Sequence, residues 1–246
     1  MTFCDPSRFS SVLNRIFREN GFSSLLSAEV TDRFCRMTER MLTVNESFNL
    51  TAITDPEKIV LLHYADCAAL AARLPRGASV VDVGCGAGFP TLPVAILRPD
   101  VSILAMDSTA KKVEYVRQTA ELLGLTGVTC RATRAEDAAQ DAALRGRFDV
   151  ATARAVAELR VLTELCLPFV RVGGVMLAMK GKNAAAEVSA ARRAIAMLGG
   201  KFAGTDEVTL TGGEESVTHP ILRIDKIAPT PAAYPRPYAK IVKKPL

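Results

Sequence analysis

The chain has 246 residues, 49% of them hydrophobic, and a formal net charge of +5 at pH 7. This apolar content excludes an intrinsically disordered chain and is enough for one α/β domain with an extension. The positive charge is compatible with a polyanionic partner such as RNA, but many proteins that bind no nucleic acid are equally basic.

Cysteine and histidine usage predicts no metal site. The six cysteines include no Cys-x-x-Cys pair, and the two histidines, His63 and His219, are far apart in the sequence. We therefore expect neither a metal nor a disulfide framework. No stretch approaches the roughly 18 uninterrupted apolar residues of a membrane span, and the chain starts without a basic segment followed by an apolar one. These features predict a cytosolic protein that binds no membrane.

Residues 7–75 have apolar side chains at helical spacing, which predicts an α-helical extension over residues 1–77. One of its helices would begin at Pro56, with Thr54 or Asp55 as a suitable cap. That helix places His63 and Asp66 three residues apart and hence on one face. A lone histidine beside an acid is more often a structural pair than a catalytic one, and the residues alone leave the choice there.

A strand, a tight loop and a helix start are predicted over residues 79–90, Ser-Val-Val-Asp-Val-Gly-Cys-Gly-Ala-Gly-Phe-Pro. The valines suit a strand buried on both faces, and the glycines at 84, 86 and 88 allow close approach of a ligand. A dinucleotide fingerprint would need its third glycine at position 89, where this chain has Phe89. The spacing therefore counts against NAD or FAD.

The pattern Gly84-x-Gly86-x-Gly88, with Asp82 two residues ahead of it, resembles the first motif of class I S-adenosylmethionine (SAM) methyltransferases. A glycine loop alone is also compatible with a simple turn between a strand and a helix. Its place after a run of valines, with an acidic residue at the end of the next strand, favours a nucleotide-like ligand.

That acidic residue is Asp107, which closes the apolar run of residues 101–106. A carboxylate at the end of the second strand can accept hydrogen bonds from both ribose hydroxyls of an adenosine. Asp107 or Ser108 could instead cap the helix that follows, and both roles can hold at once. We expect ribose binding.

The rest of the chain alternates predicted strands and helices, with strands over residues 128–132, 148–152 and 175–181 and a helix over 158–169 between the last two. Two final strands, near residues 202–210 and 216–227, complete a SAM-binding domain over residues 78–228. The resemblance to class I methyltransferases implies a Rossmann-like, seven-stranded, mostly parallel sheet with an antiparallel edge, flanked by helices.

Polar residues at the strand ends are the other candidate ligands. Glu136 or Asp137, after the third strand, could bind the amino edge of adenine, although a solvated turn carboxylate is nearly as good an interpretation. Arg154 lies just after the fourth strand, beside the switch point of the sheet, where a ligand or phosphate contact is favoured over a surface arginine. Lys180 ends the fifth strand.

Taken together, the motifs resemble the ribosomal RNA small-subunit methyltransferase G family, also called glucose-inhibited division protein B, over residues 10–227. The motifs are Asn49-Leu-Thr-Ala-Ile-Thr-Asp-Pro56, His63-x-x-Asp66, residues 81–90, Asp107-Ser-x-x-Lys-Lys112, Ala153-Arg-Ala155 and Met179-Lys-Gly181. The family methylates N7 of a guanine in the 530 loop of bacterial 16S rRNA with SAM. The resemblance implies that the SAM contacts include Gly84, Phe89, Ala135, Glu136 and Arg154.

Guanine N7 has an in-plane lone pair and loses no proton on methylation, so positioning matters more than a general base. We expect Asn49, His63 and Asp66 to line the guanine side of the site, with Arg154 and Lys180 completing the catalytic set. The expected partner is 16S rRNA, the small ribosomal subunit or its assembly intermediate, bound by a monomer. The alternative is a SAM-dependent methyltransferase that acts on a small molecule or a protein.

Residues 229–246 form a basic, proline-rich tail with interleaved tyrosines. Such a tail is expected to be extended and could follow a phosphate backbone, or it could be a solvated end. The family often has Gly-x-Pro between its Tyr-Pro-Arg and Lys-x-Pro-Leu segments, and this chain lacks it.

Overall fold

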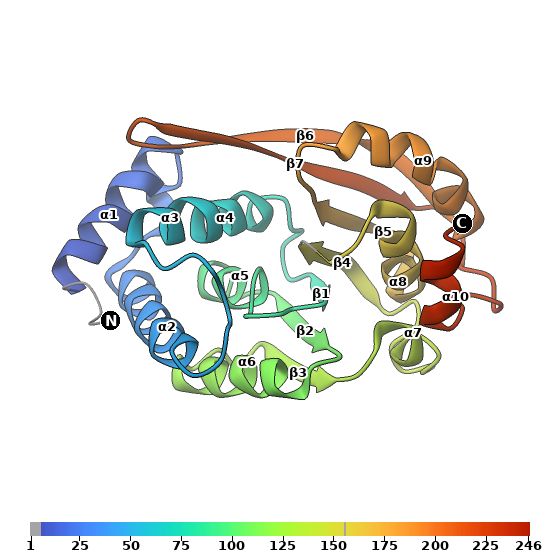
Figure 1. The fold of residues 1–246 in the computed structure, drawn as a ribbon, viewed down its shortest axis with the longest axis horizontal. Coiled ribbons are helices and arrows are strands. Elements are labelled where there is room, and N and C mark those ends of the chain that lie inside the picture. The colour runs from blue at the N-terminus through green and yellow to red at the C-terminus, as the bar shows by residue number, and fades with distance from the viewer. Residues whose placement is uncertain (1–5, 155) are drawn as a thin grey trace.

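In the computed structural model, residues 6–154 and 156–246 are described. Their centre is a seven-stranded sheet in the order β3-β2-β1-β4-β5-β7-β6 (Figure 1). Neighbouring strands from β3 to β5 are parallel, and β7 runs antiparallel to both β5 and β6. The strands are β1 (Ser79–Val83), β2 (Ser102–Asp107), β3 (Val128–Ala132), β4 (Phe148–Arg154), β5 (Val170–Met179), β6 (Gly200–Gly212) and β7 (Glu215–Lys226).

Both faces of the sheet are buried, which is why β1 is rich in valine. Successive β1 side chains point to opposite faces, so Val80 joins one hydrophobic cluster and Val81 and Val83 join the other. Helices α5 and α6 cover the first face, and α7, α8 and α9 contribute to the second. Their bounds are α5 (Thr91–Leu97), α6 (Ala110–Leu122), α7 (Ala135–Ala138), α8 (Leu159–Cys166) and α9 (Ala184–Met197), with a 3-10 turn at Leu167–Phe169.

The N-terminal helices pack on the first face. They are α1 (Pro6–Glu19), a 3-10 turn (Ser23–Leu25), α2 (Ala28–Asn45), and a continuous helix made of α3 (Pro56–Ile59), a π-helical segment (Val60–Ala65) and α4 (Asp66–Ala71). The predicted start of that last helix is confirmed, because Asp55 accepts a hydrogen bond from the Lys58 N–H and Pro56 is the first residue. The rings of Phe34 and Tyr64 pack 4.5 Å apart, in the same hydrophobic cluster as residues of the sheet.

The division into an extension (1–77), a methyltransferase domain (78–228) and a tail (229–246) stays a prediction. Residues 1–5 of the extension, and Ala155 of the predicted Ala153-Arg-Ala155 motif, lie outside the described residues. No helix in the described part of the chain is long and apolar enough to cross a bilayer.

The hairpin of β6 and β7 extends beyond the other strands and reaches α1 (Figure 1). There the side chain of Asn20 donates to the carbonyl of Thr211 at 2.7 Å and accepts from its N–H at 2.9 Å. The hairpin therefore ties the edge of the sheet to the N-terminal helices, and it carries the middle of β7 across α4.

Two predictions of local structure are wrong. The tail is not extended throughout, because Tyr238–Lys243 forms helix α10, in a stretch that is free of proline between Pro237 and Pro245. Its Ile241 is fully buried, which gives the short helix a packing reason to form. The fifth strand begins at Val170 rather than near 175, because Val170 already pairs with Phe148. A register shift follows, and Gly173 within it adopts φ +87°.

Candidate active site

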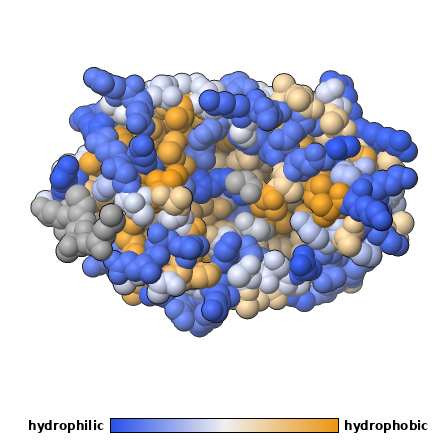
Figure 2. All heavy atoms as spheres, in the orientation of Figure 1, coloured by the Kyte–Doolittle hydropathy of each residue, from blue (hydrophilic) through white to orange (hydrophobic). Residues whose placement is uncertain are grey.

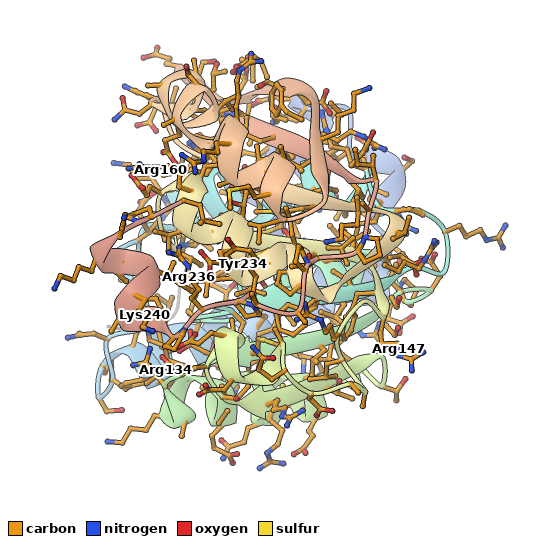
Figure 3. All side chains as sticks on the ribbon, turned by 90° about the vertical axis from the view of Figure 1, so that its right-hand side faces the viewer. Arg134, Arg147, Arg160, Tyr234, Arg236 and Lys240 are labelled. Atoms are coloured by element: carbon orange, nitrogen blue, oxygen red, sulfur yellow. The ribbon has the colours of Figure 1, made fainter. Side chains whose placement is uncertain are left out.

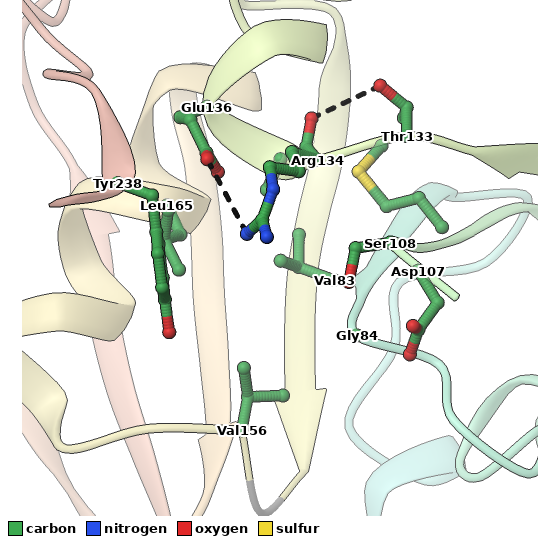
Figure 4. Close-up of a pocket in the computed structure, with 12 residues that line it drawn as sticks. Val83, Gly84, Asp107, Ser108, Thr133, Arg134, Glu136, Val156, Leu165 and Tyr238 are labelled. Atoms are coloured by element: carbon green, nitrogen blue, oxygen red, sulfur yellow. Dashed lines mark hydrogen bonds and ion pairs between the residues drawn. The ribbon is translucent and has the colours of Figure 1, made fainter. Parts of the chain in front are cut away.

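A cleft opens beside the ends of β1 and β2 and the segments that follow β3 and β4 (Figure 4). This is the edge of an open α/β sheet at which ligands bind, beside the point where the strand order reverses between β1 and β4. The cleft is lined by Val83, Gly84, Met106, Asp107, Ser108, Thr133, Arg134, Ala135, Glu136, Val156, Leu165 and Tyr238.

The glycine loop after β1 needs two of its glycines for different steric reasons. Gly84 has φ +79°, and a Cβ on it would lie 2.6 Å from Cγ2 of Val156, across the cleft. Gly88 has φ +86°, and a Cβ there would lie 2.5 Å from Cδ1 of the buried Leu92. The first glycine thus makes room for Val156 beside the loop, and the second lets the loop lie against α5.

Asp107 connects the loop to the cleft. Its carboxylate accepts hydrogen bonds from the Gly86 N–H at 3.1 Å and the Thr109 N–H at 2.8 Å. Thr109 is the residue before α6, so the helix cap is neither Asp107 nor Ser108. Each carboxylate oxygen can accept further bonds, and the side chain lines the cleft, as ribose binding requires.

Ala135 and Glu136 open the short helix α7 and line the cleft. Glu136 is 7% exposed, and its Oε1 lies 3.9 Å from a guanidinium nitrogen of Arg134. Of the two acidic residues considered at this strand end, Glu136 lines the cleft, while Asp137 is exposed outside it.

Asp82 lies beneath the loop rather than on the cleft surface. It is fully buried and accepts a hydrogen bond from the Thr91 hydroxyl at 2.6 Å. Burial raises the pKa of this carboxyl group to about 6. Its contacts hold the loop against the start of α5.

Phe89 and Arg154 belong to a second cluster, next to the cleft, which we call the arginine cluster: His63, Asp66, Phe89, Arg154 and His219. The His63 ring stacks on Phe89 with centroids 4.4 Å apart. The Arg154 guanidinium lies 5.0 Å from the centroid of the Phe89 ring, a cation–π distance. Because Val156 lines the cleft two residues after Arg154, the cluster and the cleft meet where β4 ends.

Arg154 holds the π-helical segment and α4 in place. Its guanidinium donates to the Leu62 carbonyl at 3.1 Å and to the Asp66 carboxylate at 3.4 Å, and it lies 3.2 Å from Nδ1 of His63. Nδ1 of His63 also lies 3.2 Å from the Leu62 carbonyl, and Nε2 lies 3.3 Å from the Thr51 hydroxyl, so both ring nitrogens have polar neighbours. Burial, together with the Arg154 charge, lowers the pKa of His63 to about 4, so this imidazole is neutral near pH 7.

His219 is the member of the arginine cluster that sequence reasoning missed. Its Nδ1 lies 3.4 Å from Oδ1 of Asp66, and the carboxylate raises the pKa of the imidazole. No local motif in β7 marks this histidine, and only the reach of the β6–β7 hairpin brings it to α4. The two histidines, far apart in the sequence, are therefore connected through Arg154 and Asp66.

The remaining predicted catalytic residues lie apart from this cluster. Asn49 is exposed in the loop between α2 and α3. Lys180 donates to the Ala157 carbonyl at 2.7 Å and pairs with Glu187 at 2.7 Å, so it braces the segment after β4. Within residues 6–154 and 156–246, no group of three or more His, Cys, Asp or Glu side chains is arranged to hold a metal ion.

The sheet order and its flanking helices are the fold of class I methyltransferases, as the sequence predicted. Solved structures share the fold: an O-methyltransferase from Bacillus cereus, in complex with SAH, has a TM-score of 0.52 at 17% identity and covers 77% of this chain and 90% of its own. A precorrin-6y C5,15-methyltransferase from Geobacter metallireducens has a TM-score of 0.51 at 16% identity, covering 74% of this chain and 95% of its own.

Sequence comparisons identify the family. The model described as rRNA small subunit methyltransferase G matches residues 31–211. A protein of that name from Clostridium perfringens is 44% identical over 82% of this chain and 84% of its own. One from Lactobacillus delbrueckii is 38% identical over 98% of this chain and 100% of its own. The chain belongs to the rRNA small subunit methyltransferase G family, and the predicted resemblance is confirmed.

Proposed function

We propose that this protein transfers a methyl group from SAM to N7 of a guanine in the 530 loop of 16S rRNA. The observation that carries the proposal is membership of a family whose relatives are named for small-subunit rRNA methylation. The enzyme is an rRNA methyltransferase that uses SAM, and the cleft beside the glycine loop suits that cofactor.

The residues of the cleft fit an adenosine-containing cofactor. Asp107 would accept from the ribose hydroxyls, and Glu136 would accept from the amino group of adenine, beside the Ala135 N–H at the free N-terminal turn of α7. Gly84 would leave room for the chain that leads from ribose to sulfur. We propose that Asp82 acts indirectly, by fixing the loop from below. SAM supplies a methyl group bonded to a positively charged sulfur.

The arginine cluster would form the guanine side of the site, where β4 ends. Guanine N7 attacks with its own lone pair and loses no proton, so a neutral His63 with a pKa of about 4 is no disadvantage. Asp66, whose side chain is 5% exposed, provides negative charge next to a purine that becomes positively charged. We propose that Arg154 and Lys180 are positioning residues for this region and that Asn49 contacts the RNA directly.

Surface charge favours RNA over a small-molecule or protein substrate. Lys182, Lys240, Lys243 and Lys244 are exposed, and Figure 3 shows Arg160 and Lys240 on the side of the molecule that carries α10. In the orientation of Figure 1, hydrophilic residues cover most of the rim of the molecule (Figure 2). We propose that a cytosolic monomer binds 16S rRNA within the small subunit or its assembly intermediate, and that phosphates lie along this basic side.

The test is to incubate small subunits that lack the modification with this protein and SAM, and to map N7-methylguanine by mass spectrometry of RNase fragments. A single methyl group in the 530-loop fragment is expected. SAM binding with no methyl group on the rRNA would favour the small-molecule or protein alternative.

Variants then distinguish the guanine side of the site from the cofactor side. D66N, H63Q and N49A should reduce methylation about tenfold or more while the Kd of S-adenosylhomocysteine stays within about twofold. D107A should weaken the binding of S-adenosylhomocysteine itself. S47A, an exposed change in the same loop as Asn49, is the matched control and should leave both measurements unchanged.

A further inference from the structure

The C-terminal tail contributes a wall of the cofactor cleft. Tyr238, the first residue of α10, lines the cleft together with residues that follow β1 to β4. Figure 4 places its ring on the side opposite Asp107 and Ser108, with Val156 below and Glu136 above. An adenosine whose ribose is bound at Asp107 would therefore extend its base toward Tyr238.

Contacts of the tail residues before and after Tyr238 fix the position of this tyrosine. Just before α10, the Arg236 side chain donates to the carboxylate of Glu164 at 2.8 and 2.6 Å, and the Arg236 N–H donates to it at 2.8 Å. Just after Tyr238, Ile241 is fully buried against the second hydrophobic cluster. Tyr238 is itself 39% exposed, so its side chain is positioned by its neighbours while part of it stays accessible.

The chemistry around the ring suits a purine. The Arg134 guanidinium lies 5.2 Å from the centroid of the Tyr238 ring and lines the same cleft. Val83, Val156 and Leu165 supply apolar surface, and Glu136 supplies an acceptor for an exocyclic amino group. Flat aromatic and guanidinium surfaces with one carboxylate at the edge are the groups that bind a base by stacking and by its amino group.

We infer that Tyr238 is a cofactor-binding residue, and that its ring packs against the adenine of SAM as the outer wall of the adenine site. The tail would then be part of the cofactor site and not only a basic end of the chain. This inference rests on the proposed position of adenosine in the cleft, which D107A tests separately.

Calorimetry of S-adenosylhomocysteine binding tests the inference without RNA. Loss of the ring in Y238A should raise the Kd about five- to tenfold, whereas Y238F, which keeps the ring, should stay within about twofold. V242A is the matched control, because Val242 is 49% exposed on the same helix, and it should bind like the wild type.

The outcomes distinguish the role of Tyr238 from the proposed position of adenosine at Asp107. A Kd that D107A raises and Y238A leaves unchanged would overturn the role of Tyr238 while keeping the adenosine site. A Kd that neither variant changes would overturn both. If Y238A does not fold, NMR of the wild-type protein answers the question, with the Tyr238 ring signal assigned through its loss in Y238F. That signal should shift when S-adenosylhomocysteine is added, and a signal that stays in place would refute the contact.

Discussion

His219 of β7 lies with its Nδ1 3.4 Å from Oδ1 of Asp66 on α4. The same carboxylate lies 3.4 Å from the Arg154 guanidinium through its other oxygen. One buried acid therefore joins β7, the helical extension and the end of β4. We expect the geometry of the proposed guanine site to depend on this acid more than on any other single residue in the cluster.

The first prediction concerns pH and the His219–Asp66 pair. The pKa of His219 is raised in the folded protein, so its stabilising contribution is complete below the unfolded value of about 6.5 and is lost as pH rises through the higher folded value. H219Q should therefore lower the free energy of unfolding more at pH 5.5 than at pH 8.5, by up to about 1 kcal/mol because the pair is partly solvated. Urea unfolding of both proteins at both pH values measures this difference. Equal losses at the two pH values would contradict it.

The second prediction uses the fact that the sequence has two histidines. Their pKa values are shifted in opposite directions: burial lowers that of His63 to about 4, and Asp66 raises that of His219. An NMR titration should show one imidazole that stays neutral down to about pH 5 and another that titrates above pH 6.5. H219Q should remove the second signal and leave the first. Two titrations near pH 6.5 would mean that the arginine cluster does not enclose His63.

The strand and helix pattern could be predicted because it depends on local composition. The valines of β1, the glycine loop and the acid that ends β2 follow one another within a single βαβ unit, so Asp107 and Gly84 could be assigned to one cleft from the sequence. The structure places both on its lining. Asp55 as a cap depends only on its near neighbours, and it is found as expected.

The features that sequence analysis did not predict depend on contacts between distant parts of the chain. His219 reaches Asp66 only because β6 and β7 are long, and no residue near His219 indicates that length. Tyr238 reaches the cleft because Arg236 is anchored to the buried Glu164 and Ile241 enters the core. A basic, proline-rich composition predicted an extended tail, since composition carries no information about a buried partner on α8.

The third prediction concerns the glycine loop. A Cβ at Gly88 would lie 2.5 Å from Cδ1 of Leu92, in the core, whereas Gly77, which also has positive φ at +65°, has no atom within 4 Å of such a Cβ. Both G77A and G88A should lose about 1–2 kcal/mol from backbone strain. G88A should lose about 1–3 kcal/mol more, because the core must shift to accept the methyl group. Urea unfolding compares the two, and equal losses would show that the loop relaxes freely.

The fourth prediction concerns the anchor of the tail. Glu164 is fully buried, and Arg236 is the cation that neutralises it. R236M would leave that carboxylate without a cation and should lower the free energy of unfolding by about 3–5 kcal/mol. Replacing both partners in R236M/E164L should recover most of the loss, because a buried pair of apolar groups leaves no charge unsatisfied. The matched control is R160M, since Arg160 pairs with Glu158 at 2.9 Å on the surface and should cost less than about 1 kcal/mol.

The same variants connect this anchor to the cofactor. If Tyr238 packs against adenine, R236M should raise the Kd of S-adenosylhomocysteine severalfold, because α10 loses the contact that positions its first residue. R236M/E164L should regain stability without regaining the full affinity, since the hydrogen bonds that fix the chain just before Tyr238 are still absent. Trypsin cleavage at Lys240 and Lys243 gives a second measurement: S-adenosylhomocysteine should slow it in the wild type and have less effect in R236M. If S-adenosylhomocysteine changes the cleavage rate of neither protein, the tail does not respond to the cofactor.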